Sequence, residues 1–155
     1  MSEFKPYRPC VGLLVINKKG LIFIGQRIDN NMNAWQMPQG GIEEGENIYN
    51  AGLREMKEEI GTDNVKLIGE MKEWVKYDIP NKLGKRLWNG KYRGQKQKWL
   101  AYSFLGSDNE ININTKVPEF QNWKWEKAKN LPEKAVPFKR NIYETVIEYF
   151  SENLK

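Results

Sequence analysis

Residues Pro38 to Thr62 read PQGGIEEGENIYNAGLREMKEEIGT, a glycine-rich stretch followed by a run rich in glutamate. This pattern predicts a glycine loop and then a helix over residues 47–60, which ends at Gly61. Three glutamates of this helix are spaced by three and four residues: Glu55, Glu58 and Glu59. Their carboxylates therefore share one face of the helix. Because like charges repel there, the spacing predicts that a positive group binds between them.

The composition of the chain narrows the kind of ion that this acidic face can hold. Oxygen ligands gathered without histidine or a cysteine cluster suit Mg²⁺ or Mn²⁺, and not zinc or copper. The chain contains no histidine and one cysteine, Cys10, which precedes an apolar run and is expected to be a small buried residue. Histidine-based triads, general bases and zinc sites are thereby excluded, which leaves carboxylates as the proton acceptors.

A solvated acidic surface is the alternative interpretation of these glutamates, and it is the common one for an arbitrary helix. Here we favour a metal site, because the face carries no interleaved cation except Arg54 at its border and because a glycine loop precedes it. We also expect Arg54 to form an ion pair with Glu46 that ties the glycine loop to the helix.

The other side of the same helix carries an apolar stripe. Its members follow one another at intervals of four, three and four residues: Tyr49, Leu53, Met56 and Ile60. We expect this stripe to pack against a sheet, with the acidic face on the other side. Ala51 and Gly52 lie near the acidic face, where their small size should let the glycine loop come close.

The fixed positions of this segment resemble the Nudix box, the signature of the Nudix hydrolases. From Gly40 the spacing reads G-x5-E-x7-R-E-U-x-E-E-x-G, and it is matched by Gly40, Glu46, Arg54, Glu55, Met56, Glu58, Glu59 and Gly61. Thr62 stands where the family usually has an aliphatic residue. A pattern with so many fixed positions is rarely matched by chance.

The resemblance extends beyond the box to the bacterial RNA pyrophosphohydrolases, which overlap in sequence with the dinucleoside polyphosphate hydrolases. The matching stretches are YRPCVGLLVINKKG (7–20), WQMPQGGI (35–42), GQKQKW (94–99), PEFQNWKW (118–125) and PFKRNIY (137–143). The segment 79–93 matches least well. The resemblance implies an α/β protein with the Nudix-type α/β/α sandwich and a mixed β-sheet.

The resemblance also implies site residues outside the acidic helix. The Gly40 carbonyl and Glu119 would complete the metal ligands, and either Glu119 or a glutamate of the helix would be the general base. Positions that contact the terminal phosphates or the first bases are matched by Arg8, Arg27, Phe138 and Lys139. From the residues alone, Phe138 could equally be a core residue, and Arg8 or Lys139 could be solvated.

A basic run with interleaved aromatic residues spans residues 82–98. Its cations are Lys82, Lys85, Arg86, Lys91, Arg93, Lys96 and Lys98, and Trp88, Tyr92 and Trp99 lie among or beside them. This composition predicts a surface that attracts phosphates and stacks a base, with Lys96 and Lys98 on the nucleic-acid backbone. A solvated loop whose aromatic residues pack locally is the alternative.

The remaining pattern predicts one α/β domain over residues 1–155. A hairpin is expected from VGLLVI, the turn at residues 17–20 and LIFIGQ, with a polar loop at 29–33 and a short strand at 35–37. Further strands are expected in 65–79 and 95–105. A last helix is marked by Phe138, Ile142, Val146 and Phe150. The sequence shows no leader and no membrane-spanning run, so we expect a cytoplasmic protein.

Three functions agree with these features to different degrees. The first is a hydrolase that removes pyrophosphate from the 5′-triphosphate end of RNA, leaves a 5′-monophosphate and so promotes mRNA decay. The second is the same chemistry on dinucleoside polyphosphates of the diadenosine tetraphosphate type. The third is a catalytically silent module that binds nucleotides or RNA, and the intact charged positions of the box argue against it. No obligate protein partner is evident from the sequence.

Overall fold

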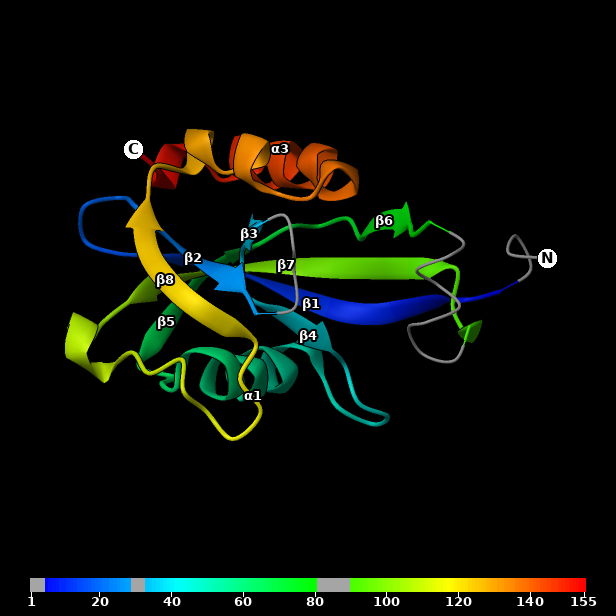
Figure 1. The fold of residues 1–155 in the computed structure, drawn as a ribbon, viewed down its shortest axis with the longest axis horizontal. Helices are drawn as coiled ribbons and strands as arrows, with labels where there is room; N and C mark the ends of the chain where they lie inside the picture. The colour runs from blue at the N-terminus through cyan, green and yellow to red at the C-terminus, as the bar shows by residue number, and fades with distance from the viewer. Residues whose placement is uncertain (1–4, 29–32, 81–89) are drawn as a thin grey trace.

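The computed structural model describes residues 5–28, 33–80 and 90–155 (Figure 1). Within these ranges the chain forms an eight-stranded sheet with the strand order β3-β2-β1-β7-β5, in which β4 pairs with β1, β6 with β7 and β8 with β2. The strands are β1 (Tyr7–Ile16), β2 (Ile22–Arg27), β3 (Trp35–Gln36), β4 (Gln39–Gly41), β5 (Val65–Glu70), β6 (Val75–Asp78), β7 (Gly94–Phe104) and β8 (Phe120–Glu126).

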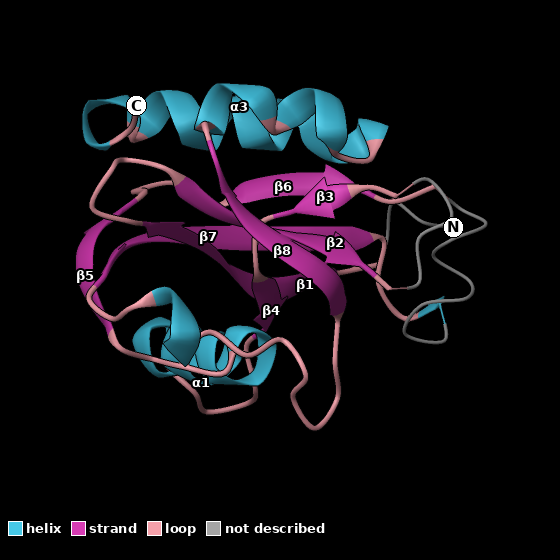
Figure 2. Cartoon of the chain, turned by 60° about the vertical axis from the view of Figure 1, so that its left-hand side comes forward, coloured by secondary structure: helices cyan, strands magenta, loops and turns pink. Residues whose placement is uncertain are grey.

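Two α-helices cover opposite faces of this sheet, α1 (Ile48–Ile60) on one face and α3 (Arg140–Tyr149) on the other (Figures 1 and 2). The other helical segments in the described ranges are short 3₁₀ turns: η3 (Asp108–Glu110), η4 (Ala128–Asn130), η5 (Pro132–Lys134), η6 (Pro137–Lys139) and η7 (Ser151–Asn153). The sheet is mixed, because β1 runs parallel to β7 and antiparallel to β2 and β4. The predicted α/β/α sandwich is confirmed.

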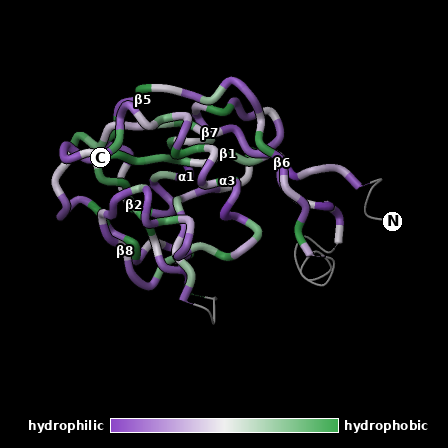
Figure 3. Tube along the Cα trace, turned by 90° about the horizontal axis from the view of Figure 1, so that it is seen from above, coloured by the Kyte–Doolittle hydropathy of each residue, from purple (hydrophilic) through white to green (hydrophobic). Residues whose placement is uncertain are grey.

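Each helix covers its own hydrophobic core, because successive side chains of a strand point to opposite faces of the sheet. Leu14, Trp99 and Val146 belong to the core under α3, whereas Leu13, Leu100 and Met56 belong to the core under α1. Figure 3 shows the hydrophobic stretches of the chain gathered in the middle of the molecule, along β1 and β7. No helix in the described ranges is long and apolar enough to cross a membrane.

The predicted hairpin is confirmed, and its turn has a clear physical basis. The side-chain oxygen of Asn17 accepts hydrogen bonds from the backbone N–H groups of Lys19 and Leu21 at 2.9 and 3.0 Å. Gly20 adopts φ +79°, a conformation that residues with a side chain rarely adopt. The predicted polar loop at 29–33 lies almost entirely outside the described residues, as do residues 81–89 of the basic run.

The limits of α1 agree with the sequence prediction. Asn47 caps the N-terminus by accepting a hydrogen bond from the N–H of Asn50 at 2.8 Å. Gly61 ends the helix in the left-handed conformation, with φ +80°, and its N–H donates to the carbonyl of Lys57. The strands expected in residues 65–79 are also present, as the separate strands β5 and β6.

The prediction that Tyr49, Leu53, Met56 and Ile60 pack against the sheet was wrong for Tyr49 and Leu53. Tyr49 and Leu53 are 43% and 39% exposed, whereas the buried residues are Ala51, Gly52, Glu55, Met56, Glu59 and Ile60. The cause is a close approach of the helix to β7, since a Cβ atom on Gly52 would lie 2.3 Å from the hydroxyl oxygen of Tyr102. The small residues therefore face the sheet and not the glycine loop, and the larger Tyr49 and Leu53 are turned outward.

Trp99 also differs from the expected role of a base-stacking residue. Its side chain is fully buried in the core under α3, edge to face with Tyr143. The ring lies over Gly12 of the neighbouring strand, where a Cβ atom would come within 2.3 Å of it. Trp99 is therefore a core residue and is not available to stack a base.

Candidate active site

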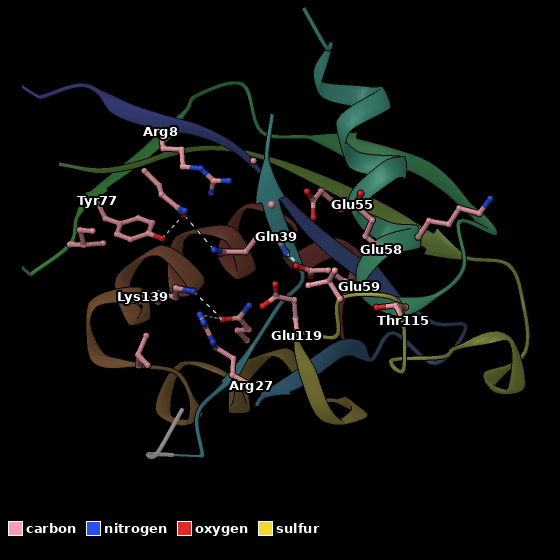
Figure 4. Close-up of a pocket in the computed structure, with 18 of the residues that line it drawn as sticks. Arg8, Arg27, Gln39, Glu55, Glu58, Glu59, Tyr77, Thr115, Glu119 and Lys139 are labelled. Atoms are coloured by element: carbon pink, nitrogen blue, oxygen red, sulfur yellow. Dashed lines mark hydrogen bonds between the residues drawn. The ribbon is translucent and has the colours of Figure 1, made fainter. Parts of the chain in front are cut away.

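A pocket of about 1090 Å³ brings together the acidic face of α1, the glycine loop and the segment at η6. Four carboxylates line it: Glu55, Glu58, Glu59 and Glu119. Five cations also line it, Lys57 from α1 and the others from elsewhere in the chain: Arg8, Arg27, Lys57, Lys116 and Lys139. Figure 4 shows Glu55, Glu58 and Glu59 on one side of the pocket, with Arg8, Arg27 and Lys139 across from them. The pocket therefore has an acidic wall and a basic wall.

The acidic wall is built on buried helix positions. Glu59 is 6% exposed, and its carboxylate accepts a hydrogen bond from the backbone N–H of Gln39 at 3.1 Å. Burial raises the pKa of Glu59 well above its usual range, and the nearby charges of Glu55 and Glu119 raise it further. Burial also raises the pKa of Glu55, while Arg54 opposes this shift. Glu58 is exposed at the rim of the wall.

Gly40 lies directly against the acidic wall. A Cβ atom at this position would lie 1.9 Å from the carboxyl carbon of Glu55, so any other residue would displace that carboxylate. The loop is held by β4, whose Gly40 is paired with Val11 of β1. The glycine is therefore required because the backbone approaches a side chain of the site, and not because of a positive φ.

Arg54 joins the glycine loop to the acidic wall. Its guanidinium contacts both carboxylate oxygens of Glu46 at 2.9 Å and donates to the carbonyl oxygen of Gly41 at 2.7 Å. The same group contacts Glu55 at 2.8 Å and Glu58 at 3.3 Å. The hydrogen bond from Arg54 lowers the pKa of Glu46 to about 2. This geometry matches the ion pair that the sequence led us to expect between Arg54 and Glu46.

The donors present on the acidic wall are the hard oxygen ligands that Mg²⁺ or Mn²⁺ prefers. In the part of the chain that the structure describes, no three acidic or thiol side chains converge as closely as ligands of one ion. The charges of Glu55 and Glu119 nevertheless act on Glu59 inside the pocket. A divalent cation would relieve that repulsion, so the residues present fit such an ion.

The basic wall contains all four residues for which the resemblance implies a substrate contact. Arg8 lies beside Gly41, and a Cβ atom there would meet its guanidinium at 2.3 Å. Arg27 and the buried Lys139 both donate to the side-chain oxygen of Gln36, at 3.4 and 3.1 Å. Phe138 belongs to η6 and not to the core of the last helix, and it lines the pocket.

A cluster of amide side chains forms the floor of the pocket, and the sequence analysis missed it. Hydrogen bonds join the amides of Gln39, Gln95 and Gln97 to Tyr77 and Trp99. Gln39, Gln95 and Tyr77 line the pocket, whereas Gln97 and Trp99 are buried and do not line it. The Tyr77 hydroxyl donates to Gln95 at 2.6 Å, and the ring of Tyr77 lies 5.7 Å from that of Phe138. The alternation in QKQKW was the available signal, because Gln95, Gln97 and Trp99 must share one face of a strand.

Because the side chains of a strand alternate, Lys96 and Lys98 point to the opposite face of β7 from Gln95 and Gln97, and neither lines this pocket. The ammonium group of Lys98 is largely buried, donates to the carbonyl of Lys72 at 2.8 Å and lies 3.7 Å from Glu70. Lys96 lies with its ammonium group 5.3 Å from the ring of Trp74. The predicted contact of Lys98 with a nucleic-acid backbone therefore does not fit its position, and Lys96 faces a different part of the surface.

Comparison with known proteins agrees with this geometry. The model of the NUDIX domain matches residues 6–146. The RNA pyrophosphohydrolase of Wolbachia pipientis subsp. Culex pipiens (strain wPip) is 49% identical over 156 residues, which cover 100% of this chain and 96% of that protein. The RNA pyrophosphohydrolase of Cereibacter sphaeroides (strain ATCC 17029 / ATH 2.4.9) is 51% identical over 151 residues, which cover 96% of this chain and 93% of that protein.

A solved structure shares the fold at lower sequence identity. The E. coli dihydroneopterin triphosphate pyrophosphohydrolase superposes with a TM-score of 0.69 at 22% identity, covering 94% of this chain and 99% of that chain. The match of the domain model over most of the chain and the identity with full-length relatives lead to one conclusion. This chain belongs to the NUDIX family.

Proposed function

We propose that this protein is a divalent-cation-dependent Nudix hydrolase that removes pyrophosphate from the 5′-triphosphate end of RNA and leaves a 5′-monophosphate. The observation that carries the proposal is the single pocket in which buried carboxylates of α1 face Arg8, Arg27 and Lys139. RNA pyrophosphohydrolases that are 49% and 51% identical over nearly the whole chain support the choice of substrate. Loss of the triphosphate would expose a transcript to decay.

The acidic wall would hold the cation. The proposed ligands are Gly40, through its carbonyl, and the carboxylates of Glu55, Glu58, Glu59 and Glu119. When bound, Mg²⁺ or Mn²⁺ supplies positive charge that polarises the phosphoryl group and makes water more acidic. Glu46 and Arg54 hold the loop and the helix together, and Arg54 also contacts the carboxylates of Glu55 and Glu58.

The other residues of the pocket bind and orient the substrate. Arg8, Arg27 and Lys139 would neutralise the phosphate chain, and guanidinium groups suit phosphate oxygens because they donate in a planar fork. The ring of Phe138, beside that of Tyr77, offers an aromatic face to the first bases.

Hydrolysis then needs one proton acceptor from the acidic wall. Water attacks phosphorus, the bond to the bridging oxygen of the anhydride breaks, and a carboxylate accepts the proton of the water. Glu59 and Glu119, which lie near each other in the pocket, are the candidate bases.

Dinucleoside polyphosphates are the second candidate substrates. The pocket, at about 1090 Å³, is slightly larger than the range usual for ligand sites and has room for nucleoside groups beside the phosphates. Nothing in the basic wall excludes a second nucleoside. A silent binding module is the least favoured function, because binding alone gives no chemical reason to keep the whole set of carboxylates.

A side-by-side turnover assay tests this proposal. The purified protein receives 5′-triphosphorylated RNA or a dinucleoside tetraphosphate, with Mg²⁺, with Mn²⁺ or after thorough chelation. We expect release of pyrophosphate from RNA, loss of turnover on chelation and recovery with either cation. Turnover that survives chelation would contradict the cation-dependent mechanism, and faster turnover of the dinucleotide would favour the second substrate.

Substitution of one carboxylate complements this assay. Glu58→Gln should keep the fold and lose at least ~100-fold in rate, because the amide carries no charge for the cation and accepts no proton. Glu44→Gln is the matched control, since Glu44 is an exposed residue of the glycine loop outside the pocket. Near-normal turnover of Glu58→Gln would show that the site is misassigned.

The proposal also includes the setting of the reaction. We propose that residues 1–155 act as one catalytic domain in the cytoplasm and without an obligate protein partner. The buried, unpaired Cys10 fits a reducing compartment. Separation of a cell lysate into cytosol and membranes, followed by detection of the protein, checks the location.

A further inference from the structure

A second hollow lies away from the candidate active site, near the start of β1. Its volume is about 530 Å³, and it is lined by Pro6, Tyr7, Glu73, Trp74, Lys76 and Lys96. None of these residues lines the first pocket. The hollow is therefore a separate feature of the surface.

The second hollow lies across the sheet from the part of the first pocket that Arg8 and Tyr77 line. Arg8 and Tyr77, which line the first pocket, are both paired with Gln95 of β7. Because neighbouring residues of a strand point to opposite faces, Tyr7, Lys76 and Lys96 lie on the other side of these strands. Since β6 pairs only with β7 among the described strands, we take it as the edge around which a single strand of nucleic acid would pass from the first pocket to the second hollow.

The second hollow combines aromatic faces with cations. The ammonium group of Lys96 lies 5.3 Å from the ring of Trp74, and that of Lys76 lies 5.5 Å from the ring of Tyr7. The side chain of Trp74 is 39% exposed, so part of it is open to a ligand. An exposed ring beside ammonium groups is the arrangement that stacks bases and neutralises the phosphates between them.

The charges of the hollow favour an anionic strand. Its lining carries two ammonium groups, of Lys76 and Lys96, and one carboxylate, of Glu73. Next to it Arg93 lies 4.8 Å from the ring of Tyr7 and forms an ion pair with Asp78 at 2.9 Å. An acidic peptide would also satisfy the ammonium groups, but it has no base to stack on the exposed part of Trp74. Single-stranded RNA uses both features.

We propose that this hollow binds the RNA downstream of its 5′ end. The inference rests on the proposed function for the identity of the strand, but it concerns a site that takes no part in hydrolysis. Binding in the hollow would favour a transcript over a dinucleotide, because a dinucleotide in the active site is too short to extend around β6.

The test measures binding and turnover in separate experiments. Binding of a 3′-labelled, 5′-hydroxyl RNA of about twelve nucleotides, within the range of single-strand site sizes, is followed by fluorescence anisotropy over a salt series. Trp74→Ala should weaken the Kd at least ~5-fold, the lower end of the effect of losing one stacked base. Lys76→Ala should flatten the slope of log Kd against log salt by about 0.7, the value for one phosphate contact on a single strand.

A matched control separates the hollow from the overall charge of the protein. Lys18→Ala also removes one exposed lysine, but at the β1–β2 turn, at the opposite end of β1 (Figure 1). It should leave the Kd unchanged. Turnover of a triphosphorylated dinucleotide should be the same for the wild type, Trp74→Ala and Lys76→Ala, whereas the KM for a long triphosphorylated RNA should rise in the two variants.

Several outcomes would overturn the proposal. Unchanged RNA binding in both variants would show that the hollow does not contact RNA, and competition by polyglutamate stronger than by RNA would assign it to an acidic protein segment. If Trp74→Ala fails to fold, the test uses Lys76→Ala alone, because Lys76 is exposed and its replacement should not disturb the fold. Failure of the wild type to release pyrophosphate refutes the proposed function alone, because the binding of the 5′-hydroxyl RNA requires no chemistry.

Discussion

Replacing Arg54 by alanine tests whether charge holds the glycine loop to α1. The guanidinium contacts acceptors of the loop and of the helix at 2.7 to 2.9 Å: the Gly41 carbonyl, Glu46 and Glu55. Hydrogen bonds to charged groups contribute about 1.5–3 kcal/mol when they are shielded from water, and much less when they are exposed.

The exposure of these groups sets the expected magnitude. The side chain of Arg54 is 24% exposed, and those of Glu46 and Glu55 are 15% and 11% exposed. We therefore take about 1 kcal/mol for each of the three acceptors, so Arg54→Ala should lower the free energy of unfolding by about 3 kcal/mol. The free energy of unfolding of Arg54→Lys should lie between those of the wild type and Arg54→Ala, because one ammonium group cannot reach all the acceptors that the planar guanidinium contacts.

Urea denaturation followed by circular dichroism measures this loss. Lys57→Ala is the control, since it removes one exposed cation from the same helix and should change the stability by no more than about 0.5 kcal/mol. A loss for Arg54→Ala that is no larger than for this control would refute the view that the guanidinium fastens the loop.

Three further predictions follow from the packing and the charges. Gly52→Val should lower the free energy of unfolding by about 2 kcal/mol, because even a Cβ atom would lie 2.3 Å from a neighbouring hydroxyl, and Lys57→Val on the exposed face serves as its control in the same denaturation assay. Burial raises the pKa of the Cys10 thiol to about 11, so alkylation of the native protein should be slow at pH 8 and rise about tenfold per pH unit up to that pKa, while fast labelling at pH 8 would contradict the burial. Arg27→Ala and Phe138→Ala should raise the KM for triphosphorylated RNA and leave cation affinity unchanged, and a weaker affinity for Mn²⁺ in titrations would place them among the ligands instead.

The sequence predicted the elements of this fold where local chemistry decides them. The ends of α1 depend on Asn47 and Gly61, a side-chain cap and a left-handed residue, and both act within one turn of the helix. The β1–β2 turn depends in the same way on Asn17 and Gly20. Such contacts are local, so a single stretch of sequence contains all the information for them.

The packing face of α1 could not be predicted by the same reasoning. Hydrophobicity alone places Tyr49 and Leu53 toward the sheet, but the distance between α1 and β7 is set by Gly52 against Tyr102, residues far apart in the chain. The burial of Glu59 likewise depends on another part of the chain. The backbone N–H of Gln39 in β4 donates to the Glu59 carboxylate and so offsets part of the free energy lost when that carboxylate is removed from water. Periodicity describes one helix and contains no information about its neighbour.

The sequence predicted the charged residues of the candidate site but not the glutamines at the floor of the pocket. The spacing of the box predicted that three carboxylates share one face, and the resemblance predicted that Arg8 and Arg27 belong to the same site; all of them line one pocket. The inward direction of Gln95 and Gln97 depends on the register of β7 beside β1, in which Gln95 is paired with Arg8. A basic run counted along the sequence does not separate the two faces of a strand.

The amide cluster on the floor gives the pocket a fixed direction of hydrogen bonding. A glutamine amide can turn end for end and exchange its donor for its acceptor, but the indole N–H of Trp99 only donates. It therefore holds the oxygen of Gln97 toward itself, and the Gln97 nitrogen donates onward. The oxygen of Gln95 accepts from three donors, the Tyr77 hydroxyl and the amides of Gln39 and Gln97. One fully buried tryptophan thus sets the polarity of a surface that it does not reach.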